Sequence, residues 1–338
     1  MEELAGTVLV GESFEPIRGR VVVEDGRIEA IEEAETDSTD IVLPTFVNAH
    51  THIGDSVAKD AAVGLSLEDA VVPPESLKHR RLQAADRAEL VTAMRRTLRY
   101  MHRTGTITCL DFREFGVKGA RALRDAAAPL DIEPFIFGSD DTAVLEVADG
   151  YGASGANDAD FTDERAACAE RGVPFAIHAG EPDATDIHPA LDLDPDLLVH
   201  MVHARQEHLD RVTAQSVPVV ACPRTNAVLE VGRPPIRDLL DHTTVALGTD
   251  NVMLNPPNMF REMAYVATHF DVSAPEVLGM ATTAGADIAG LDCGVVVPGK
   301  RASLTVIDGD SDNLAGSADP VEAVVRRATP ADVERVLV

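Results

Sequence analysis

The sequence predicts a mixed α/β protein: a (β/α)8 barrel with a small β domain formed by both ends of the chain. Three observations favour this fold. Segments typical of strands and of helices alternate through the middle of the chain, and the later strand ends lie 22 to 28 residues apart, the length of a compact strand–helix unit. Several of these strands end in polar side chains. Short β-rich segments occupy both ends of the chain.

Length and composition are those of a protein with a large aliphatic core. The chain has 338 residues, of which 45% are hydrophobic, whereas aromatic residues make up 4% and tryptophan is absent. This length suits one large domain with a smaller one, or two domains. The core must therefore consist mainly of Val, Leu, Ile and Ala, a composition typical of a parallel sheet covered by helices.

Both ends of the chain carry short β-rich segments. A hairpin turn centred on Asp25-Gly26 separates two of them near the N-terminus. Neither end has enough apolar residues to form a core alone, so we expect the two ends to make one domain. The segments are residues 7–10, 20–23, 28–31, 295–297 and 304–307. We assign residues 1–43 and 294–338 to this β domain, and residues 44–293 to the barrel.

The first predicted barrel strand lies within residues 40–52 and ends in His50-Thr51-His52. Side chains of a strand alternate between its faces, so His50 and His52 should point to one side and Thr51 to the other. Two adjacent imidazoles can hold one metal ion. The alternative is a strand that enters a loop and happens to contain two histidines.

Residues 53–83 follow these histidines and carry two glycines and two prolines, Pro73 and Pro74, so we expect an irregular segment. Long loops beside a candidate site are often lids, but a surface loop without function is an equal alternative. Residues 86–103 then form a helix with an apolar stripe.

The alternation continues to the end of the barrel. The predicted strands end near His50, Asp111, Phe137, Ser154, His178, His200, Cys222 and Asp250. Helices are predicted at residues 117–127, 162–171, 207–215 and 235–242, and two closing helices at residues 259–270 and 273–284. Such barrels carry their chemistry at the carboxyl ends of the strands, which is where these polar residues fall.

The charge of the chain is strongly acidic. Its formal net charge is −28, with 57 acidic residues against 29 basic ones, and the acidic residues are spread along the whole sequence. Such a surface repels itself unless salt screens it, so we predict a halophilic protein. The alternative is a binding site for a cationic partner. Such a site would require the acidic residues to be clustered, and in this sequence they are not. The absence of a basic stripe argues against nucleic-acid binding.

The four cysteines are widely spaced and form no Cys-x-x-Cys pair, so they indicate neither a disulfide framework nor a zinc knuckle. The first residues lack the positive region of a signal peptide, and no apolar run approaches the length of a membrane span. We therefore expect a soluble, cytoplasmic protein that has no membrane partner.

Six short motifs occur in order along nearly the whole chain. They are PTFVNAHTH (44–52), HAGE (178–181), HMVHA (200–204), CPRTNAVL (222–229), GTDN (248–251) and VPGKRASLTVID (297–308). Each motif alone is weak. Together, and in this order, they resemble the amidohydrolase superfamily, specifically its branch of adenosine and cytosine deaminases and chlorohydrolase-like enzymes.

The resemblance implies a distorted TIM-type barrel and a β-sandwich built from both termini. It also implies one divalent metal ion, with Zn favoured and Fe as the alternative. The implied ligands are His50, His52, His178 and Asp250. Two-metal members of the superfamily use a carboxylated Lys on the fourth strand, and no Lys lies between Lys118 and His178 in this sequence.

The same resemblance implies three catalytic residues. A metal can lower the pKa of bound water to about 7, and the metal-bound hydroxide would attack the substrate carbon. Asp250 would take the proton of the water, and His200 would orient the water and stabilise the oxyanion. Glu181 would protonate the ring nitrogen and then the leaving amine. The predicted reaction is deamination of an amino-heterocycle such as a purine or pyrimidine.

Several alternatives stay open. His203 is the rival of His200, and Asn226 and Asn251 could either line a substrate pocket or form turns. The same site could instead hydrolyse a cyclic amide or a chlorinated ring, and a non-catalytic barrel scaffold is the alternative from another class. We expect a small-molecule substrate and leave homo-oligomerisation open.

Overall fold

The computed structural model describes residues 1–72 and 75–338, and it divides into two compact units. The first unit contains Met1–Val47, Tyr100–Thr108 and Asn258–Val338, and the second contains Asn48–Arg99 and Cys109–Pro257. Pro73 and Pro74, which belong to the segment predicted to be irregular, lie outside the described residues. The domain boundaries predicted at residues 43 and 294 stay a prediction.

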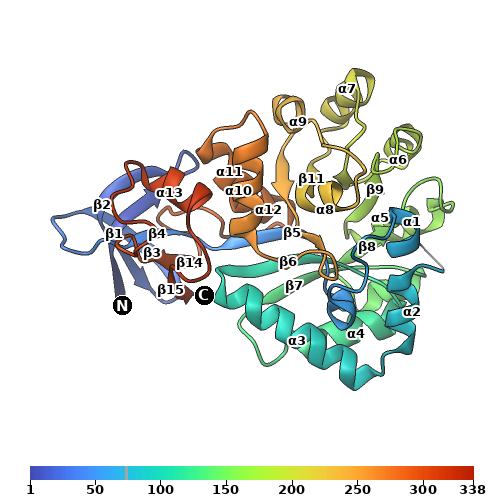
Figure 1. Cartoon of the computed structure of the whole chain (residues 1–338), viewed down its shortest axis with the longest axis horizontal. Helices are drawn as coiled ribbons and strands as arrows, with labels where there is room; N and C mark the ends of the chain where they lie inside the picture. The colour runs from blue at the N-terminus through green and yellow to red at the C-terminus, as the bar shows by residue number, and fades with distance from the viewer. Residues whose placement is uncertain (73–74) are drawn as a thin grey trace. The chain divides into compact units, whose positions relative to one another are not determined.

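The first unit joins both ends of the chain in one six-stranded sheet, as predicted (Figure 1). Its strands are β1 (Glu2–Val10), β2 (Glu15–Glu24), β3 (Arg27–Glu33), β4 (Ile41–Pro44), β14 (Leu304–Ile307) and β15 (Val333–Leu337). Their order in the sheet is β15-β14-β4-β1-β2-β3. The C-terminal strand β14 pairs antiparallel with β4, so the sheet is continuous between the two ends.

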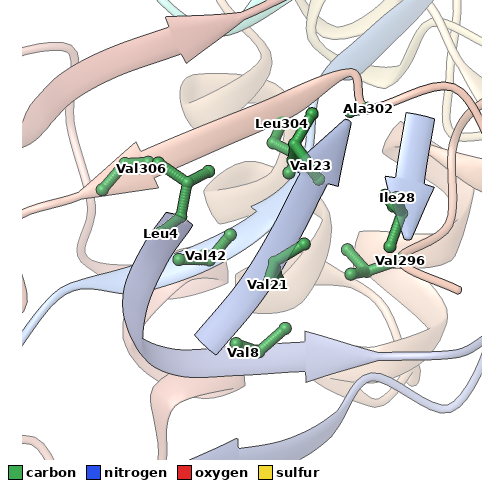
Figure 2. Close-up of a cluster of buried hydrophobic side chains, with 10 residues drawn as sticks. All are labelled: Leu4, Val8, Val21, Val23, Ile28, Val42, Val296, Ala302, Leu304 and Val306. Atoms are coloured by element: carbon green, nitrogen blue, oxygen red, sulfur yellow. The ribbon is translucent and has the colours of Figure 1, made fainter. Parts of the chain in front are cut away.

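Aliphatic side chains from both ends share the core of this sheet (Figure 2). Val21 and Val23 lie two residues apart on β2 and point to the same face, where Leu4 of β1 and Leu304 and Val306 of β14 join them. Burial of one such side chain contributes about 1.5–3 kcal/mol. Neither end could form this cluster alone, which is the physical reason that they fold together.

The prediction of a strand at residues 295–297 is wrong. Val296 is buried, and its carbonyl accepts one hydrogen bond from the Gly11 N–H over 3.1 Å, but no strand forms here. The turn that follows takes the chain away at once, because Gly299 has a φ of +90° and donates its N–H to the Ile28 carbonyl. The segment therefore packs into the core of the first unit without joining its sheet.

The predicted barrel strands form a second, curled sheet. They are β5 (Phe46–His52), β6 (Thr106–Arg113), β7 (Glu133–Gly138), β8 (Gly150–Ala153), β9 (Phe175–Ala179), β10 (Leu197–His200), β11 (Val219–Ala221), β12 (Val245–Leu247) and β13 (Asp250–Asn251). Their order is β12-β11-β10-β9-β8-β7-β6-β5-β13, and neighbours such as β9 and β10 run parallel.

The barrel closes through its last strand. Gly248 and Thr249 interrupt one strand and split it into β12 and β13, and β13 pairs in parallel with β5, with Asp250 opposite Thr51. The two ends of the sheet, β12 and β13, are thus consecutive in the chain. If they are counted as one interrupted strand, the barrel has eight strands. This confirms the (β/α)8 prediction, including the weak fourth strand β8.

Helices connect the strands, as predicted. They include α3 (Arg87–Arg103), α4 (Gly116–Ala127), α5 (Thr162–Arg171), α6 (Ile187–Asp192), α7 (Gln206–Gln215), α8 (Pro223–Val228), α9 (Ile236–His242), α10 (Met259–His269) and α13 (Pro320–Arg326). The predicted helix at residues 273–284 is instead two, α11 (Ala274–Ala281) and α12 (Thr283–Ile288). Thr282 breaks it because its ψ of −84° is not helical. No helix among the described residues combines the length and apolar character needed to cross a bilayer.

The segment after β5 is more ordered than the sequence suggested. It contains the 3-10 helix η1 (Ile53–Ala58) and the helices α1 (Leu67–Ala70) and α2 (Leu77–Ala84). Ser66 caps α1 by accepting the Asp69 N–H over 3.2 Å. Ser caps satisfy the free N–H groups of a helix start, which explains how short helices persist here. A lid function for this segment stays a prediction.

Candidate active site

β5 places His50 and His52 on one face at its carboxyl end, as the two-residue alternation predicts. The centroids of the two rings are 4.9 Å apart, and both side chains are buried. Thr51 points the other way, and its hydroxyl donates to Asp111 Oδ2 over 3.1 Å. The pair therefore faces the interior of the barrel mouth and not a loop.

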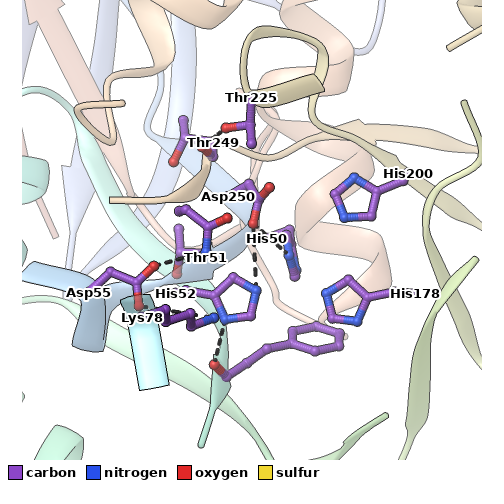
Figure 3. A network of polar contacts seen from close by, with 12 residues as sticks. His50, Thr51, His52, Asp55, Lys78, His178, His200, Thr225, Thr249 and Asp250 are labelled. Carbon is purple, nitrogen blue, oxygen red and sulfur yellow. Dashed lines mark hydrogen bonds and ion pairs between the residues drawn. The ribbon is translucent and has the colours of Figure 1, made fainter. Parts of the chain in front are cut away.

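Three further predicted site residues, on three other strands, lie close to His50 and His52 (Figure 3). His178 lies on β9, His200 ends β10 and Asp250 begins β13. Asp250 Oδ1 is 3.4 Å from Nε2 of His50 and 3.5 Å from Nε2 of His52. Potential ligand atoms of His50, His52 and His178 lie within 4.8 Å of one another, as do those of His50, His200 and Asp250.

Hydrogen bonds on the outer side of two rings fix their protons. Nδ1 of His52 lies 3.1 Å from the Phe112 carbonyl oxygen and 3.1 Å from Glu114 Oε1. Nδ1 of His178 lies 2.8 Å from the Ala153 carbonyl oxygen. These oxygens can only accept, so Nδ1 donates in both rings and each Nε2 keeps a free lone pair. His52 and His178 are thereby prepared as ligands.

His200 has the opposite tautomer. The amide nitrogen of Asn226 lies 3.2 Å from Nδ1 of His200 and 3.4 Å from Glu181 Oε1. An amide nitrogen only donates, so Nδ1 of His200 accepts and its proton is on Nε2. That Nε2 lies 3.6 Å from Glu181 Oε2. His200 thus presents a donor to the centre, whereas His52 and His178 present lone pairs.

The donor set fits a divalent metal ion. Within the described part of the chain, both ring nitrogens of His50 are buried without a hydrogen-bond partner. Burial lowers the pKa of all four imidazoles, that of His52 to about 3, so they are neutral at pH 7. The neutral imidazole nitrogens and the carboxylate oxygen face one another, and each can donate a lone pair to a cation placed between them. Zn and Fe both bind this combination of nitrogen and oxygen ligands.

Glu181 enters the centre through a sharp turn, as predicted. Gly180 has a φ of +67°, a conformation that glycine adopts without steric cost. The Glu181 side chain is 16% exposed. Burial, and then the Asp250 carboxylate, raise the pKa of Glu181 well above its usual value. This shift favours the protonated form, which a general acid needs.

The backbone is strained at two of the predicted site residues. His200 and Asp250 have φ values of 80° and 57°, in the left-handed region that favours glycine, and Met201 has a φ of 52°. Such conformations cost about 1–3 kcal/mol each and tend to occur at functional sites. Here they turn the ends of two strands sharply beside the centre.

A layer of buried charges that the sequence analysis missed lies next to His52. Lys78 of α2 forms an ion pair with Glu114 and lies 4.0 Å from Asp55 Oδ1. Arg113 pairs with Glu114 as well. Burial alone would lower the pKa of Lys78, but Asp55 and Glu114 outweigh it and raise that pKa. One signal was available, because Lys78 is one of only four lysines in this acidic chain.

Gly54 leaves the space that Arg113 fills. A Cβ atom at position 54 would lie 2.2 Å from Nη2 of Arg113, so any other residue here would displace the guanidinium. Arg113 is 1% exposed, and its burial between Glu114 and Asp111 depends on this absence of a side chain.

The remaining candidates occupy different surroundings. Asn251 is buried and donates its amide to Asp55 Oδ2 over 2.8 Å, so substrate binding by Asn251 stays a prediction. His203 is half-buried in the loop after β10, and its Nε2 lies 2.9 Å from the Val231 carbonyl oxygen. That bond holds it away from the cluster of His50, His200 and Asp250.

The sequence pattern of the amidohydrolase family matches residues 41–338. The chain therefore belongs to the amidohydrolase family, and it is an enzyme of the aminohydrolase type. It is 34% identical to a provisionally named aminohydrolase of Methanothermobacter thermautotrophicus, over 95% of this chain and 93% of the relative.

Two further matches are to a deaminase, by sequence, and to a chlorohydrolase, by fold. It is 27% identical to the 5-methylthioadenosine/S-adenosylhomocysteine deaminase of Haloarcula marismortui, over 94% of this chain and 84% of that protein. The crystal structure of atrazine chlorohydrolase from Arthrobacter aurescens, complexed with zinc, superimposes with a TM-score of 0.83. That match covers 99% of this chain and 93% of the other at 18% identity, so it speaks for the fold.

Proposed function

We propose that the protein removes the exocyclic amino group of a purine nucleoside or a related amino-heterocycle by hydrolysis, with one zinc ion in its site. The ring carbon gains the oxygen of water, and the amino group leaves as ammonia. The similarity to a deaminase of adenosine-derived nucleosides, which extends over most of both chains, supports this substrate class.

One observation carries the proposal. The free lone pairs of His52 and His178 and the carboxylate of Asp250 converge, and His200 turns an N–H group toward the same place. A site with these two kinds of side chain can both hold a cation and donate to an oxygen beside it. His50, whose ring nitrogens have no hydrogen-bond partner among the described residues, completes the set.

The residues divide the chemistry among them. A divalent ion held by His50, His52, His178 and Asp250 would lower the pKa of a bound water toward about 7. Asp250 accepts the proton of the attacking water. His200 Nε2–H donates to the oxygen that becomes negative as the ring carbon turns tetrahedral. Glu181 donates its proton to the ring nitrogen. It then passes the proton that Asp250 took from the water to the departing amine, and the hydroxyl proton on the ring carbon returns to Glu181 as the carbonyl forms.

The decisive experiment is an ammonia-release assay in molar KCl with zinc-loaded protein. Adenosine, 5-methylthioadenosine, guanine and cytosine serve as the panel. We expect ammonia from at least one purine substrate, and none after removal of the metal by a chelator. Zinc-loaded protein that releases no ammonia from the whole panel would contradict the proposed function.

A second candidate is hydrolysis of a chlorinated heterocycle, favoured by the structural likeness to atrazine chlorohydrolase. Leaving chloride needs no proton, so Glu181 would matter less for that reaction. Atrazine added to the panel, with chloride and ammonia measured in parallel, distinguishes the two functions.

A further inference from the structure

Lys78 is a buried cation that the proposed reaction does not use. Its side chain is 5% exposed, although Glu75 and Arg80, which lie close to it along the chain, are exposed. Its ammonium forms an ion pair with Glu114 Oε1 and lies 4.0 Å from Asp55 Oδ1. A lysine is rarely buried unless it is paired, so these two carboxylates account for its position.

Glu114 and Asp55 lie near two different candidate metal ligands, His52 and Asp250. Glu114 Oε1, the oxygen that Lys78 contacts, also lies 3.1 Å from Nδ1 of His52. Asp55 Oδ2 accepts the amide of Asn251 over 2.8 Å, and Asn251 directly follows Asp250 on β13. Lys78 is therefore linked to His52 through Glu114 and to Asn251 through Asp55, and Figure 3 shows it close to Asp55 and His52.

His178 and His52, two of the candidate metal ligands, are oriented by different kinds of hydrogen-bond partner. His178 donates to a backbone carbonyl, which no side-chain change can remove. The orientation of His52 depends in part on the Glu114 carboxylate, which is itself held by Lys78 and Arg113. Partners that fix the tautomer of a metal-binding histidine typically change metal affinity or activity by about 10–100-fold.

We propose that Lys78 and Glu114 are positioning residues, which hold the Nδ1 proton of His52 in place and so couple the docking of α2 to metal affinity. This inference rests on the proposed function, because it requires a metal ion at Nε2 of His52. Without Lys78, the Glu114 oxygen that faces His52 would lose its cation and its fixed position. A glutamine at position 114 would offer Nδ1 of His52 only a neutral amide oxygen beside the Phe112 carbonyl, and it would no longer form an ion pair with Lys78.

The test measures zinc affinity by chelator competition in Lys78→Met, Glu114→Gln and the double variant. We expect each single variant to raise the Kd for zinc about 10- to 100-fold. We expect the double variant to bind no more weakly than the weaker single one, because both changes break the same ion pair between Lys78 and Glu114. Lys59→Met is the matched control, since Lys59 is exposed in the same segment, and its Kd should equal that of the wild type.

Three further results separate the explanations. Glu114→Gln keeps the shape of the side chain, so it carries the test even if Lys78→Met does not fold. Wild-type zinc affinity in both single variants, whatever their melting temperatures, would overturn the inference. Failure of the wild type to bind zinc would instead refute the proposed function. A changed visible spectrum of the cobalt-substituted variants would support altered geometry at His52, which lost packing elsewhere would not produce.

Discussion

The side-chain amide of Asn226 donates to Nδ1 of His200 over 3.2 Å, and this bond decides what His200 can do. Because Nδ1 accepts, the proton of the ring lies on Nε2, on the side of Asp250 and Glu181. The same amide nitrogen is 3.4 Å from Glu181 Oε1. One buried amide therefore orients two of the side chains to which we assign proton and oxyanion chemistry.

We predict that Asn226→Ala lowers kcat by about 10–100-fold, the range typical of residues that orient a functional histidine. Bound zinc should be unchanged, because Asn226 contacts His200 and not His52 or His178. Steady-state kinetics and metal analysis check both points, with the exposed Asn157→Ala as a control. A raised KM at unchanged kcat would instead show that Asn226 binds substrate, the role suggested by the sequence.

His200→Ala should lose at least about 10²-fold in turnover, the contribution typical of a positioned donor or general acid–base group. His203→Ala should keep most of its activity, because its ring is bonded to the Val231 carbonyl outside the centre. The two variants form a matched pair, three residues apart, measured at equal zinc content. Loss of turnover in His203→Ala with an active His200→Ala would refute our assignment of the catalytic histidine.

Glu181→Gln should fold, bind zinc normally and lose about 10²–10⁴-fold in turnover, since glutamine keeps the shape but cannot transfer a proton. His178→Ala should lose zinc together with activity. Measuring metal content and ammonia release on both variants separates proton transfer from ligation. Release of zinc by Glu181→Gln would identify Glu181 as a ligand, contrary to our proposal.

Purified protein should contain about one divalent ion per chain, as a single four-ligand site implies. Elemental analysis after dialysis gives the ratio. Chelator treatment should abolish turnover, and one equivalent of zinc should restore it. Two tightly bound ions per chain would contradict this stoichiometry.

The net charge of −28 leads us to predict that the fold needs salt. The melting temperature should rise as KCl increases from about 0.1 M toward 1 M, where the screening length falls to roughly 3 Å. Sucrose, which is excluded from protein surfaces but carries no charge, is the control that isolates screening. A melting temperature that is flat or falls with KCl would argue against a halophilic protein.

Local sequence patterns were enough to predict most of the fold and the clustering of the candidate site residues. The alternation of β5 alone predicts that His50 and His52 share a face, and His178, His200 and Asp250 each lie at a strand end defined by a short apolar run. Strand ends of one barrel meet at one edge, so these local predictions add up to a cluster without knowledge of long-range contacts.

Features that depend on distant contacts were missed. Lys78 is buried because Asp55 and Glu114, which lie on other elements of the fold, neutralise it, and the residues next to Lys78 in the sequence do not show this. Thr282 breaks a helix whose sequence is otherwise continuous, and Val296 packs without a strand partner. For Lys78, the contacts with distant carboxylates outweigh the usual preference of a lysine for the surface.

The left-handed backbone at His200 and Asp250 has a consequence for directed evolution. Glycine would adopt these turns without the steric cost, which for other residues is roughly 1–2 kcal/mol. A library screened only for heat resistance should therefore enrich glycine at positions 200 and 250, and the most durable clones would be inert. Selection for heat resistance in this protein needs a simultaneous demand for turnover, because at these two positions the two properties favour different residues.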